Sequence, residues 1–220
     1  MTDTIQARVR GGTPFSGTEG QIMENFVNGR GDLISVQGLP ACAELTRMGK
    51  TWTMRTAAAS AFTYVAALPT TLAVLMLYND EPTGGKSYII DSAFLYGVTS
   101  MAAAQPVALI GQLVPTSTMV EPTHSATTTL ISSNSGKGAY DGLAKRAINV
   151  TTAFTDLWQV LCQGIVPSPT TNLGTSLYAD LWGKFIVPPG AGFGLNAVAG
   201  TAVGTAIVGL TWSEVQLALG

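Results

Sequence analysis

The sequence predicts an all-β fold in which antiparallel strands form a sandwich or a barrel. Short runs of β-branched, aromatic and aliphatic residues recur from residue 51 onward, and clusters of Gly, Pro, Asn and Asp separate them. No segment between these runs repeats with the 3.6-residue period of a helix, so a parallel sheet covered by helices is not expected. The length of 220 residues suits one β-domain with an arm rather than two full domains.

The strand signals of the first half are dense. The run 86–100 places Tyr88, Ile90, Phe94, Tyr96 and Val98 on one face, which is the alternation of a half-buried strand. A loop rich in turn residues precedes it at 79–85. The strands expected in this half are 52–56, 61–66, 71–78, 86–100 and 107–114.

A long polar loop is expected at 115–138, with a weak strand at 127–131. The segment Asp141 to Ala147 starts with a capping residue and continues with helix formers, so we expect a short helical turn there and no other helix. The remaining strands are 148–154, 156–165, 184–187, 192–198 and 206–217, which gives about eight to ten strands in all.

The segment 183–217 contains the clearest turn. Pro189 fixes φ at the first central position of a type II turn, and Gly190 supplies the positive φ that the second position requires. Phe185 and Val187 run into this turn, and residues 193–195 run out of it. We therefore expect a hairpin here.

The chain carries few charges. Charged residues make up 11% of it, hydrophobic residues 46%, and the net charge is −2. Without a basic face, binding to nucleic acid is not expected. The uncharged runs 56–79 and 185–212 are long enough to cross a bilayer, but prolines and glycines interrupt them and no basic flank follows, so no membrane span is expected. The first fifteen residues lack the apolar core of a signal peptide.

Residues 1–50 are rich in glycine and polar residues and show no sustained period, which predicts an extended N-terminal arm before a β-domain at 51–220. A few apolar side chains within the arm would anchor it along a neighbouring surface, the alternative being a disordered tail. The candidate anchors are Phe15, Ile22, Phe26 and Leu33.

The strand around residues 72–77 is apolar on both faces. In a sandwich the second sheet covers only one face, so a neighbouring subunit or the arm is expected to cover the other. Leu75 and Leu77 are the candidate contact residues. The alternative is a central strand buried in a larger monomeric barrel.

We identify no motif for catalysis or ligand binding in the sequence. The string Gly84 to Ser87 resembles the end of a phosphate-binding loop, but that pattern requires a glycine where Asp80 stands, so we interpret it as a hairpin turn. His124 is the only histidine, and Cys42 and Cys162 are the only cysteines. We expect no enzymatic activity, no catalytic residues, no cofactor and no metal.

Aromatic residues offer one candidate binding surface. Trp182 lies in the segment 167–183, which we interpret as a loop, with Tyr178 and Asp180 as a hydrogen-bonding rim. These three residues are the candidate glycan contacts. The alternative is that the tryptophan belongs to the core, where its large area is usually buried.

Two segments, LYNDEPTGGKSYIIDSAF and GKFIVPPGAGFGLNAV followed by GLTWSEVQL, resemble jelly-roll structural proteins of bacteriophage virions. The resemblance covers roughly residues 71–100 and 183–217. It implies a jelly-roll β-sandwich in a capsid decoration (cement) or shell protein, made in the host cytoplasm and located in the virion. The partners implied are other copies in a homotrimer and other virion proteins. A receptor- or carbohydrate-binding module of a phage tail or head fibre is the alternative, and an enzyme such as a polysaccharide hydrolase is a third.

Overall fold

The computed structural model describes residues 41–57, 61–69, 72–99, 103–125, 128–151, 157–166, 176–201 and 203–217. The chain divides into two units, Met1–Pro40 and Ala41–Gly220, and the described residues all belong to the second. Within them lie one helix and eleven strands: α1 (Ala41–Arg47), β1 (Thr51–Thr56), β2 (Phe62–Thr63), β3 (Leu72–Asn79), β4 (Ser87–Gly97), β5 (Gln105–Val114), β6 (Thr128–Ser132), β7 (Ala144–Thr151), β8 (Gln159–Val166), β9 (Ser176–Val187), β10 (Gly192–Ala199) and β11 (Thr205–Val215). No helix in these ranges is long and apolar enough to cross a membrane.

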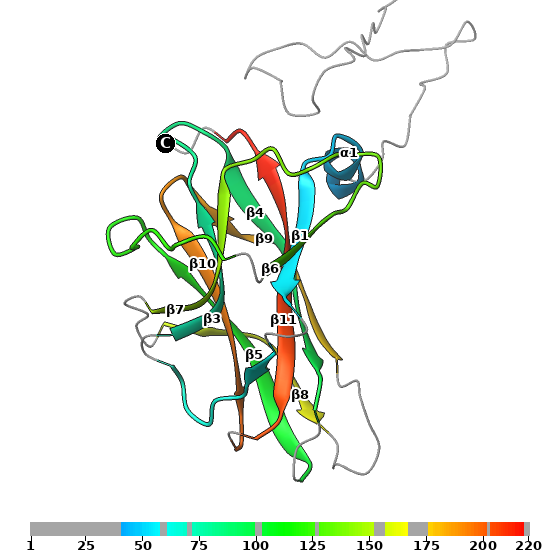
Figure 1. Ribbon diagram of the computed structural model, residues 1–220, viewed down its shortest axis with the longest axis vertical. Coiled ribbons are helices and arrows are strands. Elements are labelled where there is room, and N and C mark those ends of the chain that lie inside the picture. Colours follow the sequence, from blue (N-terminus) through cyan, green and yellow to red (C-terminus); the bar gives the residue numbers. More distant parts are fainter. Residues whose placement is uncertain are drawn as a thin grey trace, which may run out of the picture. The chain divides into compact units, whose positions relative to one another are not determined.

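The strands form two antiparallel sheets (Figure 1). Sheet 1 has the order β6-β1-β11-β4-β9, with the short strand β2 also paired to β11. Sheet 2 has the order β7-β3-β10-β5-β8. The predicted all-β sandwich is confirmed.

The strand pairs of this sandwich are nested. The first long strand pairs with the last, β1 with β11, and inside that pair lie β3 with β10, β4 with β9 and β5 with β8. This is a long antiparallel ribbon rolled into two sheets, the arrangement of a jelly roll. Strands β6 and β7 are inserted between β5 and β8, and each extends one sheet by an edge strand.

The main core lies between the two sheets. Its largest fully buried side chains include Trp212, Tyr64, Tyr88, Phe193 and Met54. Burying Phe193 or Met54 contributes about 1.5–3 kcal/mol relative to exposure. Gly111 on β5 gives Phe193 room, because a Cβ there would lie 2.7 Å from the ring and 2.9 Å from Leu161.

The turn at Pro188 to Ala191 has the predicted geometry. Gly190 has φ of +79°, and the Ala191 N–H donates to the Pro188 carbonyl at 3.1 Å. The predicted hairpin is wrong, however, because β9 lies in sheet 1 and β10 in sheet 2. The loop containing Gly84 and Gly85 likewise joins β3 of sheet 2 to β4 of sheet 1. Both turns therefore connect the two layers.

The helix prediction is also wrong. The segment expected to form a helical turn at 141–147 enters β7, where Lys145 and Arg146 pair with Tyr78 and Leu77 of β3. Sheet pairing overrides the helix propensity of this segment. The helix instead lies at Ala41–Arg47, within the range expected to be arm, and contacts β1 and β11.

A Schellman cap ends α1. Gly49 adopts φ of +68°, the Lys50 N–H donates to the Leu45 carbonyl, and the Gly49 N–H donates to the Thr46 carbonyl, both at 2.9 Å. The chain therefore turns directly from the helix into β1. Residues 41–50 belong to the β-domain unit, and the predicted arm residues before them lie outside the described residues.

A β-bulge at Asp91 interrupts the alternation of β4. On β11, the consecutive residues Thr211 and Trp212 pair with Ser92 and Ile90, so Asp91 is one extra residue on β4. Tyr88 and Ile90 face the core as predicted, but beyond the bulge the inward residues are Ala93 and Leu95. Phe94 and Tyr96 therefore lie on the outer face, opposite to the prediction, because one extra residue reverses the pleat.

The outer face of sheet 2 carries a second, smaller core. Ala73 and Met76 of β3 are fully buried there with Ile110 and Trp158, and the Trp158 indole donates to the Pro69 carbonyl at 2.6 Å. These covering residues belong to the same chain. The expectation that another subunit or the arm must cover this part of the strand is therefore wrong.

Candidate interaction surfaces

The predicted glycan contacts lie on strand β9, not in a loop. Tyr178, Asp180 and Trp182 are exposed, and they alternate with the buried residues Ala179 and Leu181. All three therefore point to the outer side of sheet 1, where β9 is an edge strand. The side chain of Trp182 is 78% exposed and that of Tyr178 is 60% exposed. The alternative that Trp182 belongs to the core is wrong.

The backbone at Trp182 is unusual. Its φ is +49°, and the following Gly183 has φ of +73°. Residues 181–184 lie opposite the single residue Asp91, so both strands bulge at this point. A bulky residue in the left-handed region costs on the order of 1–3 kcal/mol. The bulge holds a large indole out in solvent at a conformational cost.

Further aromatic side chains lie beside these residues on the outer face of sheet 1. Phe94 of β4 pairs with Tyr178, and the partly exposed Tyr96 pairs with Ser176. Gly209 of β11 lets the Phe94 ring lie close over the sheet, since a Cβ at this position would come within 2.2 Å of that ring. The outer face of sheet 1 thus presents an aromatic surface next to the β9 edge.

A buried carboxylate organises one end of the sandwich. Glu214, near the end of β11, accepts a hydrogen bond from Tyr140 Oη at 2.5 Å and one from Lys86 Nζ at 3.2 Å. Tyr140 Oη also accepts from the Ala144 N–H at 3.0 Å. Gly142 lies directly over this group, because a Cβ there would be 2.3 Å from Tyr140 Oη. The cluster ties β11 to the loops before β4 and before β7.

The pKa shifts follow from this packing. Burial by itself would lower the pKa of Lys86, but the charge and hydrogen bond of Glu214, aided by Glu81, outweigh it and raise the pKa. Burial is the main cause of the raised pKa of Tyr140, with smaller contributions from Tyr88 and Glu214. The tyrosine therefore stays a neutral hydrogen-bond donor and the lysine stays charged. This arrangement stabilises the loops.

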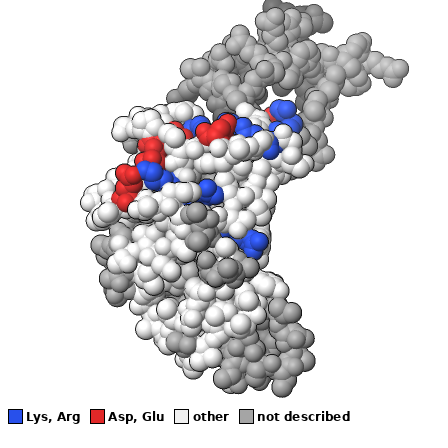
Figure 2. All heavy atoms as spheres, in the orientation of Figure 1, with Lys and Arg blue, Asp and Glu red and all other residues white. Residues whose placement is uncertain are grey.

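A second set of ion pairs lies at the same end of the sandwich, which we call the charged end. Lys145 of β7 contacts Asp80 at 2.8 Å and also pairs with Glu121. Lys137 pairs with Asp141 at 2.9 Å. Figure 2 shows the charged atoms in a band near one end of the visible face, while the described atoms toward its lower end are uncharged.

Three connections at the opposite end of the sandwich carry no charge. The segments 57–71, 98–104 and 200–204 contain no Asp, Glu, Lys or Arg. Hydrogen bonds hold them together: the Val98 N–H donates to the Thr205 carbonyl at 2.8 Å, and the Ala199 N–H donates to the Val65 carbonyl at 2.9 Å. Leu68 and Val203 are exposed here. We call this surface the uncharged end.

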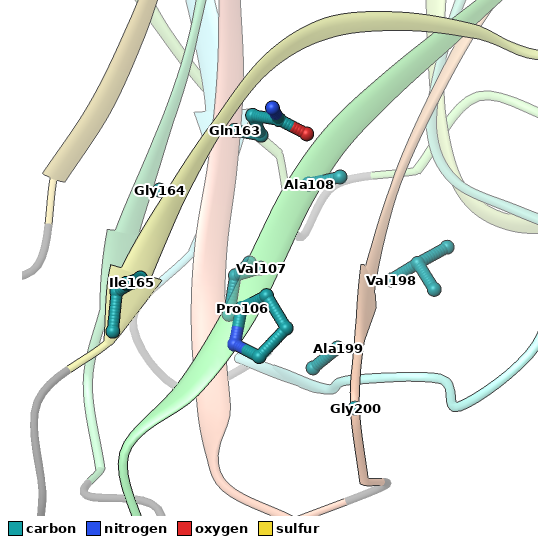
Figure 3. Close-up of a pocket in the computed structure, with 9 residues that line it drawn as sticks. All are labelled: Pro106, Val107, Ala108, Gln163, Gly164, Ile165, Val198, Ala199 and Gly200. Atoms are coloured by element: carbon teal, nitrogen blue, oxygen red, sulfur yellow. The ribbon is translucent and has the colours of Figure 1, made fainter.

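A groove of about 560 Å³ opens on sheet 2 near the uncharged end. Strands β5, β8 and β10 contribute its walls, and no lining residue is charged. Figure 3 shows Pro106 and Ile165 on adjacent strands, with Val198 and Ala199 across from Pro106. The groove is lined by Pro106, Val107, Ala108, Gln163, Gly164, Ile165, Val198, Ala199 and Gly200.

The predicted oligomer contacts divide into two groups. Leu75 and Leu77 are fully buried between the sheets of their own chain, so they offer no surface to another copy. The four predicted anchors of the arm lie outside the described residues: Phe15, Ile22, Phe26 and Leu33.

The sequence-based prediction missed the residues of the Glu214 cluster. Glu214 and Tyr140 are 74 positions apart in the chain. Glu214 is the single charged residue of the final strand, and this is the one signal in the sequence that could have identified it.

Comparisons with known proteins add little to this description. No family model and no curated protein matches the chain. The cryo-EM structure of Mud Crab Dicistrovirus matches with a TM-score of 0.15 and 11% identity, over 98% of this chain and 91% of that chain. A TM-score this low carries no argument. The strand pairing itself defines the class of protein, a jelly-roll β-sandwich.

Proposed function

We propose that this chain is a non-enzymatic structural protein of a virus particle, and specifically that it decorates or builds the capsid of a bacteriophage. It would be made in the host cytoplasm and would assemble with further copies, as a homotrimer, and with other virion proteins. Residues 1–40 would act as an arm that strengthens attachment to the particle.

The uncharged end is the observation that carries this proposal. A soluble domain normally uses charges to keep its surfaces apart from those of its neighbours, and about a quarter of an average chain is charged. Here three connections at one end carry no charge, and the apolar side chains of Leu68 and Val203 are exposed among them. Such a surface favours contact between proteins. The jelly roll is a fold that viral capsid proteins use, although lectins and cupins use it too.

The positions of the acidic residues also favour a structural role. Asp80, Glu121 and Glu214 take part in ion pairs that link loops to strands, and Glu81 pairs with Lys86 of its own loop. Glu214 is buried beneath Gly142 and Tyr140, where a substrate cannot reach it. These carboxylates stabilise the charged end.

The proposal is tested by expressing the full chain and measuring its mass in solution, and by imaging virus particles with and without it. We expect an oligomer that adds ordered density to a capsid. A monomer that neither assembles nor attaches to any particle would contradict the proposal.

The exposed Trp182 favours a second candidate function, the recognition of a carbohydrate or host receptor. An indole held out by a strained bulge, with Tyr178 and Asp180 on the same side of β9, matches the stacking surface and polar rim that sugars require.

Glycan-array binding by the full chain tests this second function. We expect Trp182→Ala to abolish binding and Trp182→Phe to retain part of it. Leu157→Ala removes a side chain of similar exposure, 68%, and serves as the matched control. Equal binding by the Trp182→Ala variant and the control would exclude a role for Trp182.

A further inference from the structure

The strand orders of the described residues end in four edge strands, and three of these carry features that prevent pairing with another chain. Natural sheets protect their edges with charges, bulges or very short strands. Strand β9 has Asp180, Lys184 and the wide bulge, and β7 has Lys145 and Arg146. Strand β6 is only five residues long.

Strand β8 is the exception among these edges. Its eight residues, QVLCQGIV, contain no charge and no proline. Val160 is 60% exposed and Ile165 is 71% exposed. Within the part of the chain that the structure describes, no strand pairs with the outer edge of β8, so this edge offers backbone groups and apolar side chains together. It is the edge of the molecule best suited to association.

The one irregularity of β8 serves packing within the chain. The register against β5 shifts beside Leu161, whose side chain turns inward toward Gly111 and Phe193. As a result Val160, Gln163 and Ile165 all pair with outward-facing residues of β5. The same side of β8 borders the uncharged groove. We call Val160, Gln163, Ile165 and this groove the β8 surface.

We propose that the β8 surface is an interface between two copies of this chain, formed by antiparallel pairing of β8 with β8 of a second copy. This inference rests on the proposed function in that both require copies to associate, and because the contact is two-fold it would join copies that belong to different trimers. In a two-fold contact the same strand meets itself, so any charge on it would face a like charge.

The neutrality of β8 removes this repulsion. The uncharged groove beside the strand can receive apolar side chains of the second copy without leaving a charge unpaired. A partner whose surface carried charges would find no counter-charge on β8 or in the groove. The second copy is therefore the occupant that the charge pattern favours.

The experiment is analytical ultracentrifugation of the full chain up to a concentration on the order of 100 μM, well above the micromolar Kd of a weak standard-sized interface. Ile165→Lys and Val160→Lys each place two lysines, one from each copy, in the uncharged contact. Each should raise the Kd for self-association by about tenfold or more. Ile131→Lys on the β6 edge, where the side chain is 49% exposed, is the matched control and should leave the Kd unchanged. Circular dichroism confirms that each variant is folded.

Hydrogen exchange gives a second readout that does not depend on a substitution. Amides of β8 should exchange more slowly at high than at low chain concentration, whereas those of β6 should not change. Association of the wild type with no effect of either β8 variant, or with no change in β8 exchange, would overturn the β8 interface and leave the proposed function standing. A wild type that stays monomeric at the highest concentration would overturn the interface as well. The proposed function would then be decided separately, by imaging particles.

Discussion

Replacing Tyr140 with phenylalanine tests whether the Glu214 cluster holds the charged end together. The substitution removes only the hydroxyl group, so the contact of the ring with Trp52, at a centroid distance of 4.8 Å, and that with Trp212 can remain. It deletes the hydrogen bond to the Glu214 carboxylate and the one from the Ala144 N–H.

The magnitude follows from these two bonds. A hydrogen bond to a charged group contributes about 1.5–3 kcal/mol, and a buried N–H left without a partner costs about 1–3 kcal/mol. Because local relaxation recovers part of this, we expect the free energy of unfolding to fall by about 3 kcal/mol. For a domain of this size, 1 kcal/mol shifts Tm by about 2–4 °C, so Tm should fall by about 6–12 °C.

The assay is thermal unfolding followed by circular dichroism at pH 7. Tyr178→Phe is the matched control, because that hydroxyl lies on an exposed face. Gly142→Ala should also lower Tm, since its Cβ would push against Tyr140 Oη and Glu214. If Tyr140→Phe unfolds within about 2 °C of the control, the cluster does not stabilise the fold as argued, because even the smaller of the two costs corresponds to that shift.

Three further outcomes are expected. Gly209→Ala should destabilise the domain by about 3 kcal/mol in urea unfolding, because its Cβ would lie 2.6 Å from the Met54 carbonyl, while Gly138→Ala, with open space around it, should not. Burial raises the pKa of Asp91 despite its hydrogen bond from Ser213, so the folded state binds this proton more tightly than the unfolded state. Stability should therefore fall as pH rises from about 4, and Asp91→Asn should remove that fall in a pH series of Tm values; an unchanged pH series would contradict this. Deleting residues 1–40 should leave Tm unchanged but weaken attachment to particles, whereas deleting residues 1–50 should also lower Tm, because it removes α1 and the Lys50 carbonyl that accepts from the Glu214 N–H. Equal Tm values for the two deletions would exclude a stabilising role for α1.

Local chemistry predicted most of the strands and the shape of the turn at Gly190, but it placed the first part of β9 in a loop and the start of β7 in a helical turn. It did not predict which sheet each strand would join, because a Pro-Gly turn fixes two backbone angles and leaves the direction of the following strand open. The turns at Gly84 and Gly190 were therefore interpreted as hairpins, although both connect layers. The faces of β4 were predicted only up to Asp91, since a bulge leaves no mark in the alternation of residue types.

The candidate contacts show the same limit. Trp182 was identified from its residue type and its polar neighbours, and its exposure confirms that it lies at the surface. The prediction for Leu75 depends on a strand that is apolar on both faces. Trp158, from a distant segment, packs over the outer face of that strand, and Leu75 itself lies in the main core. The packing of Trp158 over β3 and the hydrogen bond between Tyr140 and Glu214 both join positions that are far apart in the chain. Sequence periodicity gives information only about residues that are close in the chain, so it does not predict these contacts.

The nested pairing has a consequence for how the protein is made. Sheet 1 joins β1, the first long strand, to β11, the last, so a ribosome must release almost the whole chain before this pair can form. Contacts of such long sequence separation give slow folding, on the order of milliseconds to seconds or longer. Strand β1 has no partner in β11 during synthesis and is then open to wrong pairing. A truncated chain lacking β11 should therefore fail to form sheet 1, and only full-length copies should be competent for any later association.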